Sequence, residues 1–312
     1  MSRWNFAALV LAFAAQTLFA APAMAQIPVT EDEDLVVTGQ RIDEAVRNFV
    51  EELAAPASSE DQLGRWNREI CVGAIGIRAR YGQYLVDRVS QRAQQIGLQA
   101  GAPGCRANVV VFVTPDASRL AAGMVEQFEG LMAARYADNT VTAGGEALDA
   151  FVNSDRTVRW WHVAYTTTAD GQTLRDAPAS NGAGGLRGQV MRTTSLGFGR
   201  LSRTTRQDFN RVIIIVDATQ AAGIQFEALA DYVSMVALAQ IDPEARPTGV
   251  DSILNLFNDQ AALRPTTITE WDLAYLRGLY EAPRNARNSN AQEGAIARSM
   301  ADEVSAPPPP QE

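Results

Sequence analysis

The chain has 312 residues with 27 basic, 36 acidic and one histidine side chain, so its formal net charge is −9, and all 27 basic residues are arginine. This acidic balance argues against nucleic acid as a partner, because phosphates need a concentrated basic surface, and against electrostatic docking on anionic lipid. The absence of lysine excludes enzymes that use a lysine Schiff base, a Ser-Lys dyad or a P-loop lysine. The single histidine could serve at most one Ser-His-Asp triad, and the sequence has no Gly-x-Ser-x-Gly turn to hold the serine of such a triad.

Residues 1–25 have the pattern of a secretory signal peptide. Arg3 supplies a positive charge, an apolar run follows, and the sequence APAMAQ offers small residues for cleavage after Ala25. The apolar run has about 15 residues, fewer than the ~20 that a spanning helix needs, so a retained anchor is the less favoured alternative. We therefore expect cleavage after Ala25, a periplasmic or secreted protein, and no membrane span in the mature chain.

Residues 26–59 are expected to form an acidic linker with a short helix around 41–54. The stretch LVVTGQRI, which covers residues 35–42, resembles the segment that opens the plug of TonB-dependent outer-membrane receptors. The rest of the chain lacks the long series of alternating strands that such a barrel requires. We interpret residues 35–42 as an extended linker or edge strand, with a periplasmic docking motif as the alternative.

Residues 60–281 are expected to form a single α+β domain, a mixed β-sheet covered by helices with an inserted helix after the second strand. Apolar and β-branched runs predict strands at 68–77, 107–114, 157–168 and 211–217, with an edge strand around 190–198. Helical spacing of apolar residues predicts helices at 80–98, 114–136, 226–240 and 269–280. In the last of these, Thr269 and Asp272 have the spacing of a capping box.

Residues 282–312 are expected to form a tail. Its first part, to residue 304, could hold a loosely docked helix, and the end, SAPPPPQE, is typical of disordered or polyproline segments.

Cys71 and Cys105 are the only cysteines. A pair of cysteines in an exported protein most often forms a disulfide, which at this spacing would contribute about 3–4 kcal/mol. Two free thiols are the alternative.

Four segments resemble a bacterial secreted family of unknown function with a zincin-like, metallopeptidase fold. They are RVIIIVDAT, ALADYVSMVALAQID, DSILNLF and ITEWDLAYLRGLY. The resemblance implies that the helix after the central strand occupies the place of a zinc-binding helix, where two histidines one turn apart share a face.

The ligands of such a zinc site do not carry over to this chain. The corresponding positions are Asp231 with Met235 or Tyr232 with Val236, and the single histidine, His162, lies in the predicted strand 157–168. We expect His162 to be structural, sharing a strand face with Trp160 and Ala164. The helix is then scaffold, the chain is a catalytically degenerate relative, and we expect no metal and no cofactor.

Two groups of polar residues are candidate ligand or partner sites. Glu227, Asp231 and Ser234 share one helix face, and could hold a cation or polar ligand, although the solvated side of an amphipathic helix is the favoured interpretation. Six arginines and one acid lie between residues 187 and 211. Of these, Arg192, Arg200, Arg203 and Arg206 could bind a carboxylate, a phosphate or an acidic partner, although a solvated loop paired with the protein's own acids is favoured.

The sequence thus favours a non-catalytic binding protein whose partner is a periplasmic or outer-membrane protein. The alternative is a carboxylate-dependent or atypical-metal hydrolase. Asp217, at the end of the central strand, is the best-placed acid for such chemistry, but an aspartate there is as often a helix cap or turn residue.

Overall fold

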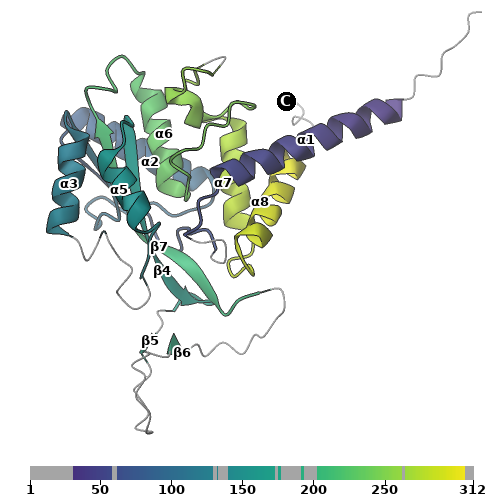
Figure 1. Cartoon of the computed structure of the whole chain (residues 1–312), viewed down its shortest axis with the longest axis horizontal. Helices are drawn as coiled ribbons and strands as arrows, with labels where there is room; N and C mark the ends of the chain where they lie inside the picture. Colours follow the sequence, from purple (N-terminus) through teal and green to yellow (C-terminus); the bar gives the residue numbers. More distant parts are fainter. Residues whose placement is uncertain are drawn as a thin grey trace, which may run out of the picture.

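The fold is a mixed five-stranded β-sheet with helices on both faces, and the expected α+β class is confirmed (Figure 1). The structure, a computed structural model, describes residues 31–57, 62–128, 132, 140–172, 175–176, 191–192, 202–261 and 264–305. In the sheet order β1-β2-β7-β4-β3, the bounds are β1 Val72–Ile75, β2 Val109–Thr114, β7 Thr205–Asp217, β4 Val158–Thr168 and β3 Thr140–Val141. A separate two-stranded ribbon consists of β5 Arg175–Asp176 and β6 Met191–Arg192.

β7 lies at the centre of the sheet, as its apolar run predicts. It is parallel to β2, which is parallel to β1, and it is antiparallel to β4. Ile213 and Ile215 are buried on one side of the sheet, and Val212 and Ile214 are buried on the other. An unbroken apolar strand of this kind needs cover on both faces, and the helices supply it.

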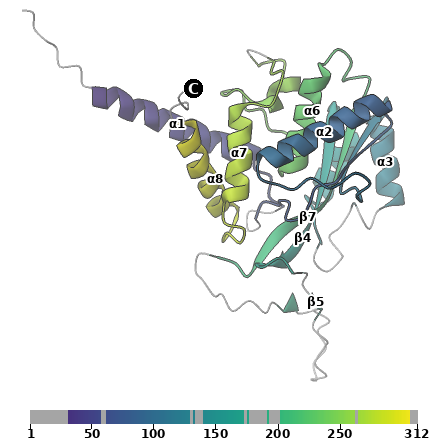
Figure 2. The ribbon, with the colours of Figure 1, turned by 180° about the vertical axis from the view of Figure 1, so that it is seen from behind.

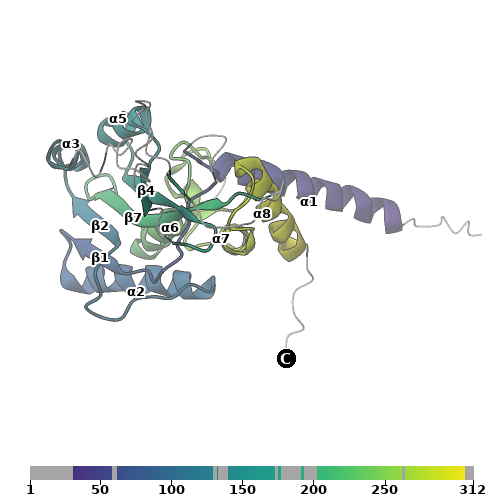
Figure 3. The same ribbon diagram turned by 90° about the horizontal axis from the view of Figure 1, so that it is seen from below.

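Two groups of helices provide this cover (Figure 3). α3 (Ala117–Gln127) and α5 (Gly145–Asn153) pack on the face of Ile213 and Ile215. On the opposite face lie α2 (Ala79–Gln95) and α6 (Phe226–Leu238), which contact each other (Figure 2). The main core continues into the 3-10 helix η1 (Ile253–Phe257), α7 (Glu270–Glu281), α8 (Ser289–Val304) and the carboxyl-terminal half of α1 (Glu31–Leu53).

The interpretation of residues 35–42 as an extended linker or edge strand is wrong, because these residues belong to α1. Val46, Phe49 and Leu53 are buried in the main core, at the spacing of one helical face, and α1 packs on α8. The amino-terminal half of α1 extends away from the body (Figure 1). The packed second half corresponds to the predicted segment 41–54, and the helix continues ten residues beyond it toward the amino terminus.

The expected loose docking of the last helix is also wrong. Ile296 and Met300 of α8 have no exposed surface, and the buried Gln292 accepts a hydrogen bond from the backbone N–H of Leu63 at 2.7 Å. The packed core therefore continues past residue 281, where we had expected a tail to begin. The predicted signal peptide and the proline-rich end lie outside the described residues.

Two predicted segments are shorter in the structure. The buried strand predicted at 68–77 is reduced to β1, which lies at the sheet edge with Ile75 54% exposed. The helix predicted at 114–136 starts later, because Asp116 caps α3 by accepting from the N–H of Arg119 at 3.0 Å. Most of residues 129–139, and most of the edge strand predicted around 190–198, lie outside the described part.

Two local predictions are confirmed. Cys71 and Cys105 form a disulfide that joins the start of β1 to the loop before β2. Thr269 and Asp272 form the capping box of α7. None of the helices in the described part of the chain has both the length and the hydropathy that a bilayer span needs.

Candidate functional site

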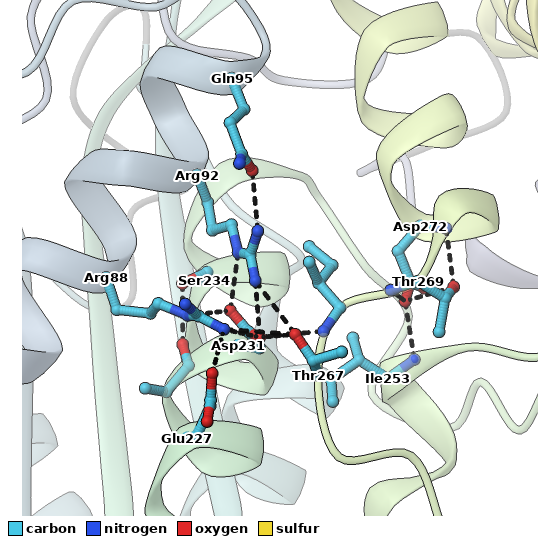
Figure 4. Close-up of polar contacts among 12 residues, drawn as sticks. Arg88, Arg92, Gln95, Glu227, Asp231, Ser234, Ile253, Thr267, Thr269 and Asp272 are labelled. Carbon is cyan, nitrogen blue, oxygen red and sulfur yellow. Dashed lines mark hydrogen bonds and ion pairs between the residues drawn. The ribbon is translucent and has the colours of Figure 1, made fainter. Parts of the chain in front are cut away.

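Asp231, in the polar stripe of α6, is the centre of a buried ion cluster (Figure 4). Its carboxylate has no exposed surface and accepts two hydrogen bonds each from Arg88 and Arg92 of α2, at 2.8 to 2.9 Å. The hydroxyl of Thr267 donates to it at 2.7 Å and the backbone N–H of Ile268 at 2.9 Å. The cluster therefore ties α2, α6 and the segment before α7 together.

The contacts of Asp231 also fix its charge. Burial opposes ionisation, but the hydrogen bonds from Arg92 and Arg88, helped by those from Thr267 and Ile268, hold the pKa of this carboxyl far below its usual range. Asp231 is therefore an anion near pH 7, and its lone pairs are already used within the chain.

The interpretation of this stripe as a solvated helix face is wrong for two of its three residues. Asp231 and Ser234 are fully buried, and the Ser234 hydroxyl donates to the carbonyl of Ala230 at 2.7 Å. Glu227 alone is exposed, and it pairs with Arg88 at 2.9 Å. The sequence signal that we missed is the pair Arg88 and Arg92, one helical turn apart on α2.

The four arginines that the sequence suggested as a binding site, in the segment 187–211, do not form one surface among the described residues. Arg206 is buried, and its Nε donates to Asp208 at 3.0 Å, so it pairs with the protein's own acid. The Nε of Arg203 donates to the carbonyl of Arg287 at 2.7 Å. Arg192 is described only as backbone in β6, and Arg200 lies outside the described residues.

His162 makes structural contacts. Its Nε2 lies 2.8 Å from the carbonyl oxygen of Val236, which can only accept, so Nε2 carries the proton and donates. The ring stacks on Phe209 with centroids 5.0 Å apart, and Trp160 and Ala164 lie in the same core, as the alternation of the strand predicts. Burial lowers the pKa of His162 to about 4, so the ring is neutral near pH 7.

This lowered pKa predicts a pH-dependent stability. The unfolded chain takes up a proton on His162 near pH 6.5, whereas the folded chain resists it until about pH 4. Keeping His162 neutral therefore costs the folded state nothing above pH 6.5. As the pH falls from 6.5 to 4, the free energy of unfolding decreases by about 3 kcal/mol because the unfolded chain alone binds the proton. Asp272 has the opposite effect on stability. Burial raises its pKa to about 6, so the folded chain holds this proton more tightly than the unfolded chain, and the resulting stabilisation is lost as the pH rises to about 6.

The comparison that isolates His162 uses His162→Gln, which keeps an N–H donor for Val236 but does not titrate. Denaturant unfolding at pH 7 and pH 4 should show the wild type losing about 3 kcal/mol more than the variant over this range. Equal losses in the two proteins would contradict a buried neutral histidine.

Asp217 serves as a turn residue. Its Oδ1 accepts from the backbone N–H groups of Thr219 at 2.9 Å and Gln220 at 3.1 Å, directly after β7. The carboxylate thus closes the turn that leads from the central strand toward α6.

The face of α6 that would carry a zinc-binding pair is apolar. The Tyr232 ring contacts Trp160 and Phe257, with centroids 6.2 and 5.0 Å away, and Val236 is fully buried. Within the described ranges, no group of three or more histidine, cysteine, aspartate or glutamate side chains is placed to hold a metal ion.

A groove follows the outer edge of β4, opposite β7. β3 pairs only with Ala164 and Tyr165 of β4, which leaves the edge of residues 158–163 without a strand neighbour among the described residues. Two cavities of about 430 and 400 Å³ meet there and share Arg156 and Glu244. We call them together the β4-edge groove.

The larger cavity of the β4-edge groove is mostly apolar, the smaller one is mostly polar, and a pair of charged residues lies between them. Phe151, Trp160 and Ile241 line the larger cavity, and Tyr232 lines the smaller one. Arg156 and Glu244 form an ion pair where the cavities meet. The other charged residues that line the groove are Glu146, Arg159 and Asp242 in the larger cavity and Asp155 and Arg246 in the smaller one.

The groove can therefore take an elongated ligand with one apolar end, which fits the larger cavity, and one polar end, which fits the smaller cavity. Sequence analysis missed it, because its walls come from α5, β4 and the segment 240–244, which only the fold brings together. Neither family models, nor curated proteins, nor solved structures give a match to this chain.

Proposed function

We propose that this chain is an exported, non-catalytic binding protein on a zincin-like scaffold, and that the β4-edge groove holds its ligand. The observation that carries the proposal is the groove itself, two connected cavities of about 430 and 400 Å³ beside α6. Volumes of this size are typical of small-molecule sites. A partner protein could enter the same groove with an extended segment.

Three features support export and the scaffold. The first 25 residues have a signal-peptide pattern, and the disulfide between Cys71 and Cys105 is typical of oxidising compartments. The central strand leads into α6, and α6 packs against the sheet, as the resemblance to zincin-like proteins implies. A cleavage site after Ala25 is part of the proposal.

The non-catalytic character rests on how the candidate groups are used. The ring of His162 is neutral and its Nε2–H is bonded to Val236, the Asp231 carboxylate is saturated by arginines, and Asp217 closes a turn. Each of these groups has a structural partner that it would have to leave before it could transfer a proton.

One observation favours the alternative, a carboxylate-dependent hydrolase. Asp242 lines the larger cavity, and burial raises its pKa, as a general acid needs. Glu146 and Glu244 line the same cavity and could supply the second carboxylate.

The groove is tested by filling it. Ala150, on the exposed side of α5, lines the larger cavity, so Ala150→Trp places an indole in the groove without disturbing the core. We expect the purified chain to bind the uncharged dye N-phenyl-1-naphthylamine saturably, with a rise in fluorescence, and Ala150→Trp to weaken binding at least about tenfold.

The matched control is Ala122→Trp, at an exposed position of α3 that does not line the groove. Equal dye binding by the wild type and both variants would contradict the assignment of the groove. If the wild type hydrolyses a chromogenic glycoside or ester and Asp242→Asn does not, the proposed binding function is wrong and the hydrolase alternative is supported.

A further inference from the structure

A second cavity, separate from the groove, lies where β1 and β2 begin, next to the disulfide. Its volume is about 360 Å³. It shares no lining residue with the β4-edge groove. The lining residues are Arg68, Glu69, Cys71, Arg106, Ala107, Asn108, Asn210 and Arg211. We call it the arginine cavity.

The three arginines of this cavity have no anionic partner in the part of the chain that the structure describes, although Glu69 also lines the cavity. Among the described residues, none of their guanidinium groups forms an ion pair. Arg68 donates to oxygens of Asn210 only, and the Nε of Arg211 is buried without a hydrogen-bond partner. By contrast, carboxylates neutralise the well-buried Arg92 and Arg206.

The chain has nine more acids than bases, yet no described carboxylate pairs with these three arginines. Guanidinium groups around one cavity repel each other, and an anion between them would remove this repulsion and accept their hydrogen bonds. Arg211 is also the last of the six arginines in the segment 187–211, and it lines this cavity.

The walls of the arginine cavity are held in place before any ligand binds. The disulfide fixes the loop that carries Arg106. The buried side chain of Asn108 accepts from the N–H of Cys71 at 2.8 Å and donates to the carbonyl of Glu69 at 2.9 Å. Arg211 lies in the central strand β7. The backbone that carries the three arginines is therefore in place before binding, and only their side chains have to be ordered around a ligand.

We propose that the arginine cavity binds a phosphoryl oxyanion, a free phosphate or the phosphate of a headgroup. Planar guanidinium groups match the oxygens of phosphate in pairs, and the two asparagines add polar contacts. The lining contains no aromatic ring on which a nucleobase could stack, so the ligand is small or presents only its phosphate.

The test is calorimetric titration of the purified chain with inorganic phosphate at ionic strength held constant with sodium chloride. We expect a dissociation constant of about 1 mM or tighter, weakened at least about tenfold in Arg211→Gln and in Arg106→Gln. Arg106 is exposed, so its variant should fold even if the half-buried Arg211 proves sensitive. The matched control is Arg298→Gln, at an exposed position of α8 away from the cavity.

Phosphate binding no stronger than chloride binding in the wild type, or an equal loss of affinity in Arg298→Gln, would overturn the proposal. Sedimentation with vesicles then identifies the source of the phosphate. Retention on phosphatidylglycerol but not phosphatidylcholine vesicles, lost in Arg106→Gln, would assign the site to a headgroup. Phosphate binding without retention would assign it to the free ion. The dye that tests the β4-edge groove is uncharged, so its binding does not depend on the arginine cavity. Either proposal can therefore be contradicted while the other stands.

Discussion

Replacing Asp231 with alanine is expected to lower the free energy of unfolding by about 3–5 kcal/mol, because the change leaves two poorly exposed guanidinium groups without their anion. The side chains of Arg88 and Arg92 are only 14% and 9% exposed, so water cannot replace the lost carboxylate. In a domain of this size, the midpoint of thermal unfolding should fall by roughly 6–20 °C. Circular dichroism during heating measures it.

Glu227→Ala is the matched control. Glu227 also pairs with Arg88, but its side chain is 55% exposed, and exposed pairs contribute less than about 1 kcal/mol. Small and equal effects of Asp231→Ala and Glu227→Ala would mean that the cluster does not hold α2 against α6.

Removal of the disulfide is the second large effect. The bond between Cys71 and Cys105 spans 34 residues, and in the chain-entropy model a loop of this length contributes about 3–4 kcal/mol. The double variant Cys71→Ala, Cys105→Ala should therefore unfold at a lower denaturant concentration by that free energy. Reductant should weaken the wild type similarly and leave the double variant unchanged. Coincident unfolding curves for wild type and double variant would contradict the prediction.

The elements that sequence predicts well are those whose signal is local. The apolar run of β7 requires burial on both faces, and Thr269 with Asp272 specifies the start of α7 within four residues. The disulfide was predicted because the chain has one cysteine pair and its first 25 residues have the pattern of a signal peptide.

Burial of polar groups is decided by partners far away in the chain, and here sequence reasoning failed. Asp231 has the spacing of a solvated stripe, yet it is buried because Arg88 and Arg92, 143 and 139 residues earlier, neutralise it. Likewise, α8 has a weak apolar pattern, and only its contacts with α7 and α1 show that it belongs to the core.

The candidate sites were harder still to predict. The β4-edge groove depends on β3 being short. The arginine cavity depends on Arg68 and Arg106, which precede β1 and β2, lying beside Arg211 in the middle of β7. No periodicity in the sequence marks either arrangement. The arginine-rich segment was a useful pointer, but it indicated the wrong members, since Arg203 and Arg206 bond within the protein.

The central claim is that α6 is a structural helix that holds no metal ion. Its sheet-facing residues Tyr232 and Val236 pack in the core, and Asp231 is engaged by arginines. Elemental analysis of the purified chain after extensive dialysis tests this directly. We predict zinc far below one ion per chain. Stoichiometric zinc that survives dialysis would contradict the claim, since it would require a metal centre that the contacts of α6 leave no ligands to build.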